Sequence, residues 1–225
     1  MQIEPPARGG SARIGVGGNE LVFEAVRGGY VLLWHAGRQA RRYVVGLPDT
    51  GGLSLVLRPP PYPIKLLIRE TIAIAPGARV RGFVQLPLVP TLLWSGPSVV
   101  TCTGTGTAPD CAGRSTVPAD AEQVLFEFTP AGLTAEWTES DAMTSCCESS
   151  WFVRFPVHGG EARVTVPLRL MNRSGQVLSP AHVPMSMQAS DLLELRSGIV
   201  TAPHRLTWNG REWLRTPAAS AEVSA

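Results

Sequence analysis

Alternation of apolar and polar residues is the strongest constraint in this sequence. In residues 162–170 every even position is apolar, whereas the odd positions carry arginine, threonine or proline. Successive side chains of a β-strand point to opposite faces, so this pattern predicts a strand with one buried and one exposed face. Pro167 falls on the exposed side and removes one backbone donor, which predicts an edge position or a bulge.

The same pattern recurs along most of the chain and is separated by turn residues. Gly17-Gly18, Gly28-Gly29 and Asn209-Gly210 are hairpin signals, and Asn-Gly favours a tight type I′ turn. Helix signals amount to one or two turns near residues 191–194. The sequence therefore predicts an all-β fold of the antiparallel β-sandwich type. Further strands are expected at residues 21–26, 30–34, 42–45, 53–57, 64–74, 79–86, 124–128, 133–137, 151–157, 205–208 and 211–214.

A long segment without periodicity interrupts this series of strands. Residues 95–123 are rich in Thr, Gly, Ala, Pro and Ser, and so long an irregular stretch is uncommon inside a compact domain. We interpret it as an insertion or linker between an N-terminal β half, residues 1–94, and a C-terminal β half, residues 124–215. Residues 216–225 are expected to form a disordered tail. The pattern leaves open whether the halves form one domain or two.

Charge and hydropathy exclude some classes of partner. The net charge of +2 over 225 residues is too small for a nucleic-acid footprint, so no nucleic-acid partner is expected. Lys65 is the only lysine. No apolar stretch approaches the ~20 residues that a membrane-spanning helix needs, and the first residues do not read as a secretory signal. We therefore expect a cytoplasmic protein without a membrane span.

The four cysteines are the candidate metal or redox residues. Cys146 and Cys147 are adjacent, a spacing that does not suit zinc, which usually takes ligands from separated pairs such as C-x2-C. We interpret them as loop thiols, and no cofactor is predicted. Two alternatives stay open: a zinc site built from Cys102, Cys111, Cys146 and Cys147 or completed by His158, and a Cys102–Cys111 disulfide in an oxidising compartment.

Catalytic motifs do not appear in the sequence. It contains no G-x-S-x-G elbow, no Walker A loop and no H-E-x-x-H, and therefore we name no catalytic residue and lean against an enzyme. The carboxylates of Glu136, Glu139 and Asp141 cluster after a strand, where a solvated strand end is the better interpretation. Asn172-Arg173-Ser174 matches the N-glycosylation pattern, which carries little meaning without a signal peptide.

One local patch combines basic and aromatic residues. Arg38, Arg41 and Arg42 lie beside Trp34 and Tyr43, a combination that can bind single-stranded nucleic acid. The small net charge favours a turn with solvated arginines instead. Most of the six tryptophans fall at positions phased toward the interior and are expected in the core. A carbohydrate platform made of one or two of them is the alternative.

Five segments resemble a known family. They are residues 55–63 (Leu-Val-Leu-Arg-Pro-Pro-Pro-Tyr-Pro), the Pro-Gly turn of residues 75–78, residues 84–88, residues 130–137 and residues 164–175. Together they resemble an uncharacterised, largely archaeal domain-of-unknown-function family. The resemblance implies an all-β cytoplasmic protein of unknown activity, and it carries over no catalytic residues.

These observations favour a binding or assembly module that presents strand edges and loops to a protein partner. The proline-rich stretch at residues 59–63, with Tyr62 as a candidate binding residue, suits partner contacts better than chemistry. The alternatives are a metal- or redox-active protein that uses the cysteine loop, and a carbohydrate-binding sandwich. The identity of the partner and the oligomeric state stay open.

Overall fold

The chain is almost entirely β-stranded and forms two compact units. A computed structural model describes residues 2–4, 6–47, 52–96, 122–137, 142–156, 162–195 and 198–216. Over these ranges there is no α-helix, and one short 3-10 turn, Ala189–Asp191, is the only helical element. Thus none of them offers a helix of the length and apolarity that crossing a bilayer requires. The predicted all-β, sandwich-type fold is confirmed.

Each unit is assembled from two separate segments of the chain. Unit 1 comprises residues 1–57 and 89–131, and unit 2 comprises residues 58–88 and 132–225. The chain therefore passes from one unit to the other after Leu57, after Leu88 and after Ala131. These boundaries differ from the predicted halves. The insertion expected at residues 95–123 and the tail expected at 216–225 lie largely outside the described residues.

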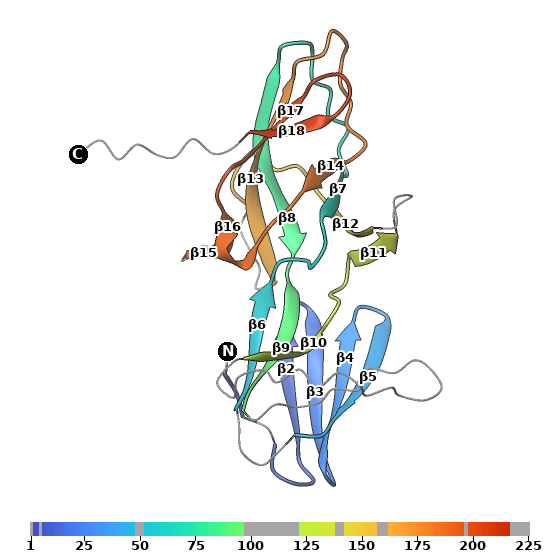
Figure 1. Cartoon of the computed structure of the whole chain (residues 1–225), viewed down its shortest axis with the longest axis vertical. Helices are drawn as coiled ribbons and strands as arrows, with labels where there is room; N and C mark the ends of the chain where they lie inside the picture. Colours follow the sequence, from blue (N-terminus) through green and yellow to red (C-terminus); the bar gives the residue numbers. More distant parts are fainter. Residues whose placement is uncertain are drawn as a thin grey trace, which may run out of the picture. The chain divides into compact units, whose positions relative to one another are not determined.

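Unit 1 contains two four-stranded sheets, of order β1-β6-β9-β10 and β2-β3-β4-β5 (Figure 1). The second is a meander whose first two hairpins are closed at the predicted turns, where Gly17, Gly18 and Gly28 have positive φ angles. The strands of the first sheet are β1 (Gln2–Ile3), β6 (Gly52–Arg58), β9 (Val89–Ser95) and β10 (Gln123–Glu127). The strands of the second are β2 (Ser11–Val16), β3 (Asn19–Val26), β4 (Gly29–Ala36) and β5 (Gln39–Val45).

Aromatic rings join the two sheets of unit 1. Trp34 on β4 is only 1% exposed and stacks on Phe128 with ring centroids 5.1 Å apart. Its indole N–H donates a 2.9 Å hydrogen bond to the carbonyl of Thr129. Tyr43 on β5 packs against Phe126 and Phe128 at 5.0 and 5.4 Å. Such ring pairs stabilise a core beyond the area they bury.

Unit 2 contains a four-stranded and a six-stranded sheet. The four-stranded sheet has the order β11-β12-β7-β14, and the other has the order β15-β16-β13-β17-β18 with β8 on the second edge of β13. The strands of the first are β7 (Ile64–Ile68), β11 (Leu133–Trp137), β12 (Met143–Ser149) and β14 (Val183–Met185). Those of the second are β8 (Arg79–Pro87), β13 (Arg163–Asn172), β15 (Leu192–Leu195), β16 (Gly198–Thr201), β17 (His204–Trp208) and β18 (Trp213–Thr216).

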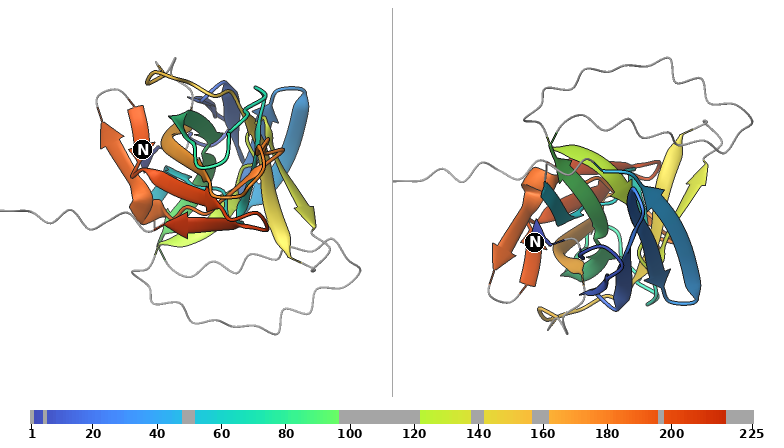
Figure 2. Two further views of the ribbon diagram at one scale, coloured as in Figure 1. Left: turned by 90° about the horizontal axis from the view of Figure 1, so that it is seen from above. Right: turned by 90° about the horizontal axis from the view of Figure 1, so that it is seen from below.

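β13 is the central strand of unit 2. It pairs antiparallel with β8 over most of its length, and on its other edge it pairs in parallel with β16 and then with β17. Figure 2 shows these two neighbours in orange and red beside β13. Its even-numbered residues Val164, Val166, Leu168 and Leu170 are all buried, as the alternation predicts.

The edge position predicted for Pro167 is wrong, because β13 has neighbours on both sides. Phe83, which is opposite Pro167 on β8, exchanges its backbone hydrogen bonds with Phe152 instead. The ring nitrogen of Pro167 therefore faces the other edge, where the neighbour changes from β16 to β17 at residues 202–203. The missing donor of proline coincides with an interruption in the neighbouring strand, so no ladder hydrogen bond is lost there.

Two other predicted strands are shorter than expected. β7 ends at Ile68, and Ile74 rejoins the structure only through a bridge to Leu178. In the described part of the second stretch, residues 151–156, only Phe152 pairs with a strand, and Val153 is 80% exposed. In both stretches the alternating pattern thus extends beyond the residues that pair.

The Asn209-Gly210 hairpin exists, but its loop is longer than a type I′ turn. Trp208 pairs with Trp213, so residues 209–212 form the loop. The side-chain oxygen of Asn209 accepts hydrogen bonds from the backbone N–H groups of Arg211 and Glu212 at 2.8 and 2.9 Å. Asparagine thus closes this loop through its side chain rather than through positive φ angles at two central residues.

Asn172 ends β13 as a fully buried polar residue. Its side-chain amide donates to the carbonyls of Ile74 and Gln176, and its oxygen accepts from the backbone N–H and hydroxyl of Ser174. Because a buried polar group is stable only when it is paired, these bonds fasten the loop after β13 to the segment after β7. The side chain that begins the N-x-S pattern is therefore occupied inside the fold.

Gly82 on β8 provides the space for one large ring. A Cβ atom at this position would overlap the indole of Trp151. We expect Gly82→Ala to lower the free energy of unfolding by about 1–3 kcal/mol through overpacking, as measured by urea denaturation. Gly175→Ala, where a Cβ atom meets nothing within 4 Å, is the matched control. Equal stability of the two variants would show that the indole does not occupy this position.

Candidate functional site

Strand register gives the β11-β12-β7-β14 sheet two different faces. Leu133, Cys147, Leu66 and Val183 lie in one row across the four strands and are all buried. The next row, Thr134, Cys146, Lys65 and Pro184, points to the opposite face. The first face belongs to the core of unit 2. The second face is mixed in chemistry and carries the candidate site.

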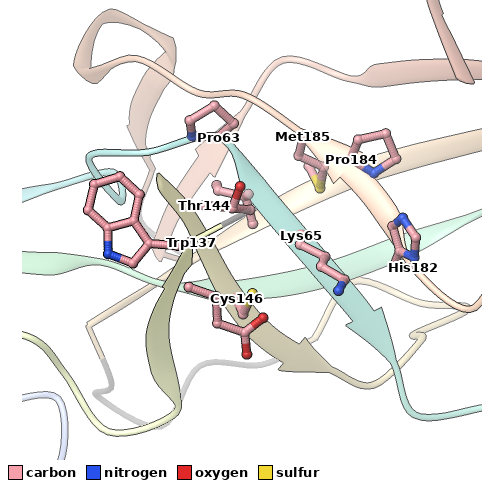
Figure 3. A pocket seen from close by; sticks show the side chains of 10 residues that line it. Pro63, Lys65, Trp137, Thr144, Cys146, His182, Pro184 and Met185 are labelled. Carbon is pink, nitrogen blue, oxygen red and sulfur yellow. The ribbon is translucent and has the colours of Figure 1, made fainter. Parts of the chain in front are cut away.

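A groove of about 690 Å³ is lined in part by residues of this second face, namely Lys65, Glu136, Thr144, Cys146 and Pro184. Figure 3 shows Trp137 and His182 toward its opposite ends, with Thr144 and Cys146 of β12 between them. Trp137 is 72% exposed at the end of β11. The groove thus combines a large exposed ring, a thiol and charged groups on a rigid sheet. Its lining consists of Pro63, Ile64, Lys65, Glu136, Trp137, Thr144, Cys146, His182, Pro184 and Met185.

The charges of the groove act on the Cys146 thiol. Burial raises the pKa of Cys146, and the hydrogen bond with the Glu136 carboxylate and the charge of that carboxylate raise this pKa further. The positive charge of Lys65 opposes them. The thiol is therefore held in its protonated form and donates to Glu136. On the other face, burial raises the pKa of Cys147 to about 12. A reactive cysteine needs a lowered pKa, so neither thiol is prepared for nucleophilic or redox chemistry.

The structure separates the predicted cysteine candidates. Cys146 and Cys147 are successive residues of β12 and point to opposite faces of the sheet, so both cannot bind one ion. Cys102, Cys111 and His158 lie outside the described residues. Within the described ranges, no three His, Cys, Asp or Glu side chains come together in a way that could hold a metal ion. A zinc site that involves Cys102, Cys111 or His158 stays a prediction.

None of the predicted binding candidates lines the groove. They lie in the loop before β7, in the turn between β4 and β5, and on β5. Tyr62 is partly exposed in the loop that precedes β7, next to groove residue Pro63. In unit 1, Arg38 lies in the turn between β4 and β5, and Arg41 and Arg42 lie on β5; all three are exposed. The buried position of Trp34 removes it as a stacking platform for these arginines.

The sequence contained weak signals for the residues of the groove. Lys65 is the only lysine and interrupts an apolar strand, which indicates a charged position on a partly exposed face. The phase of residues 133–137 predicts an inward Trp137, and this prediction is wrong. β11 is an edge strand, so the sheet provides no further neighbour to cover its last residue. Glu136 and Cys146 meet only through the register of β11 with β12.

Comparisons with known proteins add nothing to this assignment. No family model, no curated protein and no solved structure matches the chain. The function must therefore be argued from the groove itself.

The raised pKa of Cys147 predicts an alkaline loss of stability. The unfolded thiol ionises from about pH 9, whereas the folded thiol ionises only near pH 12, so rising pH favours the unfolded state in this window. We expect the difference in unfolding free energy between the protein and its Cys147→Ala variant to be constant below pH 9. It should then shrink as the pH rises toward 12. Chemical denaturation under reducing conditions measures it, and a constant difference up to pH 11 would contradict the burial of this thiol.

Proposed function

We propose that this chain is a non-catalytic binding module that holds an extended peptide segment of a partner protein in the groove beside β11. The observation that carries the proposal is the position of the groove next to a sheet edge. β11 and β14 are the outer strands of their sheet, and the groove lies across all four strands. An exposed edge offers backbone donors and acceptors that an added strand can satisfy.

β11 is the better edge for an added strand. It has five residues, and its last four are exposed, whereas β14 has only three residues. A partner strand beside β11 would present every second side chain to the groove, next to Thr134 and Glu136. Backbone hydrogen bonds would supply affinity, and the groove would select side chains.

Charge complementarity defines the chemistry of the peptide. Glu136 on β11 attracts a basic side chain, and Lys65, two strands away on β7, attracts an acidic one. Trp137 gives a broad apolar surface for a proline or aliphatic residue, because an aromatic ring contributes large contact area at little entropic cost. The expected ligand is an extended segment that carries an apolar residue, a basic residue and an acidic residue.

The alternatives have less support. The raised pKa values of Cys146 and Cys147 disfavour a thiol-based redox function at these residues. A carbohydrate platform has one favourable observation, the exposed ring of Trp137 beside polar groups. We keep the carbohydrate function as an outcome of the test below.

Location and family are part of this proposal. Cys146 and Cys147 are free thiols, which supports a reducing compartment such as the cytoplasm. Membership in the largely archaeal family that the sequence resembles would agree with an all-β binding protein.

A displayed library of random ten-residue peptides and a glycan panel, each screened against the full chain, test the proposal. We expect enriched peptides with the apolar, basic and acidic residues described above. Trp137→Ala should weaken their binding at least about tenfold in fluorescence polarisation, since buried aromatic anchors dominate such contacts. Lys65→Glu should weaken the binding of peptides that carry an acidic residue. Binding to this variant should recover when the acidic residue of the peptide is changed to lysine. Arg27→Glu, in the exposed turn between β3 and β4 of unit 1, is the matched control.

Three results would contradict the proposal. They are a library without enriched peptides, peptides whose binding Trp137→Ala and Lys65→Glu leave unchanged, and binding of a glycan panel that depends on Trp137 without any peptide binding.

A further inference from the structure

A row of arginines crosses the six-stranded sheet of unit 2, apart from the peptide groove. Arg169 on β13 is directly opposite Arg81 on β8 and directly opposite Arg205 on β17. Neighbouring strands lie about 4.8 Å apart, so three positively charged side chains start within about 10 Å. Arg79 lies at the end of β8 on the same face.

This row costs stability. Like charges directly opposite on neighbouring strands repel each other. The charge of Arg81, burial, and the charges of Arg205 and Arg79 lower the pKa of Arg169, as this repulsion predicts. An anion beside the row would relieve the repulsion.

Among the described residues, the ion pairs of Arg13 with Glu20 and of Arg69 with Glu148 involve none of the arginines in the row. In addition, the Nε atom of Arg205 is buried without a hydrogen-bond partner among the described residues. A buried donor without a partner is uncommon in a native protein.

A pocket of about 210 Å³ lies against the row. Arg81 and Arg169 form its charged part, and Phe83, Val153, Pro167 and Pro203 form most of its apolar part. Phe155 packs on Phe83 at 5.6 Å in an edge-to-face arrangement. Val153 is 80% exposed although it is apolar. The pocket therefore places an exposed apolar wall beside unpaired guanidinium groups.

We propose that this pocket binds a small phosphate or sulfate monoester, with the oxyanion on the arginine row and the organic group against Phe83 and Val153. Guanidinium groups bind oxyanions through paired, charge-assisted hydrogen bonds. A doubly charged anion would also remove the repulsion along the row. The volume suits a single small group and is too small for a folded partner.

Calorimetric titration and thermal unfolding of the full chain at constant ionic strength test the proposal. The probes are inorganic phosphate, phenyl phosphate and phenyl sulfate. We expect phenyl phosphate to bind at least about threefold more tightly than inorganic phosphate and to raise the unfolding temperature, because a ligand of the folded state stabilises it. Comparison of phenyl phosphate with phenyl sulfate distinguishes the two ester classes.

Arg169→Gln removes the centre of the row. We expect it to weaken phenyl phosphate binding at least about tenfold, while its unfolding temperature without ligand equals or exceeds that of the unmodified chain. Sites built for ligands commonly sacrifice stability in this way. Arg81→Gln should behave similarly and provides a second variant. Arg211→Gln, which makes the same charge change in the loop between β17 and β18, should bind normally, and so should Trp137→Ala, because the peptide groove is separate.

Two results would overturn the proposal. They are the absence of any binding by the three probes, and equal affinity of Arg169→Gln and Arg211→Gln for phenyl phosphate.

Discussion

Backbone pairing of β13 on both edges is the constraint on which unit 2 depends. A buried strand must satisfy its N–H and C=O groups, and β13 does so with β8 on one side and β16 and β17 on the other. The even-numbered side chains are then directed into the core, and the odd-numbered ones form the opposite face. Both proposed sites of unit 2 follow from such separation of faces. In the four-stranded sheet, Cys147 faces the core and Cys146 faces the groove, although they are neighbours in the sequence.

Strands with one solvent-exposed face and one buried face are predicted well from the sequence. β8 and β13 alternate strictly and are found near their predicted positions. β9 was not predicted, because nearly all of its side chains are buried and its sequence does not alternate. β12 was not predicted because its four buried residues are all serine or cysteine, which do not mark a strand. The edge position predicted for Pro167 was wrong because the sequence shows that this residue lacks a backbone N–H donor, but it does not show that the neighbouring strand is interrupted at the same point.

The sites were less predictable than the strands, because register joins residues that are far apart in sequence. Arg81, Arg169 and Arg205 are each ordinary exposed positions of a strand when they are considered alone. Lys65, Glu136 and Cys146 come from three strands, and one of them, β7, pairs in parallel with β12. Parallel pairing cannot be inferred from a local turn, whereas the β2–β5 meander follows directly from its glycine turns. The adjacent cysteine pair was the candidate metal or redox site in the sequence. In the structure, the groove residues around Cys146 determine the state of this thiol, and its neighbour in the sequence faces the other way.

The discontinuous make-up of the two units has a consequence for synthesis on the ribosome. The β2–β5 hairpins can close as soon as their turns emerge, because every pairing is between consecutive strands. β8 must wait for β13, and β13 must wait for β17, so both edges of β13 are paired only after residue 208 has been made. Such distant pairings are slow to form and leave strand edges exposed in the meantime. Until residue 208 has been made, the nascent chain therefore carries the paired β2–β5 meander followed by strands that await their partners.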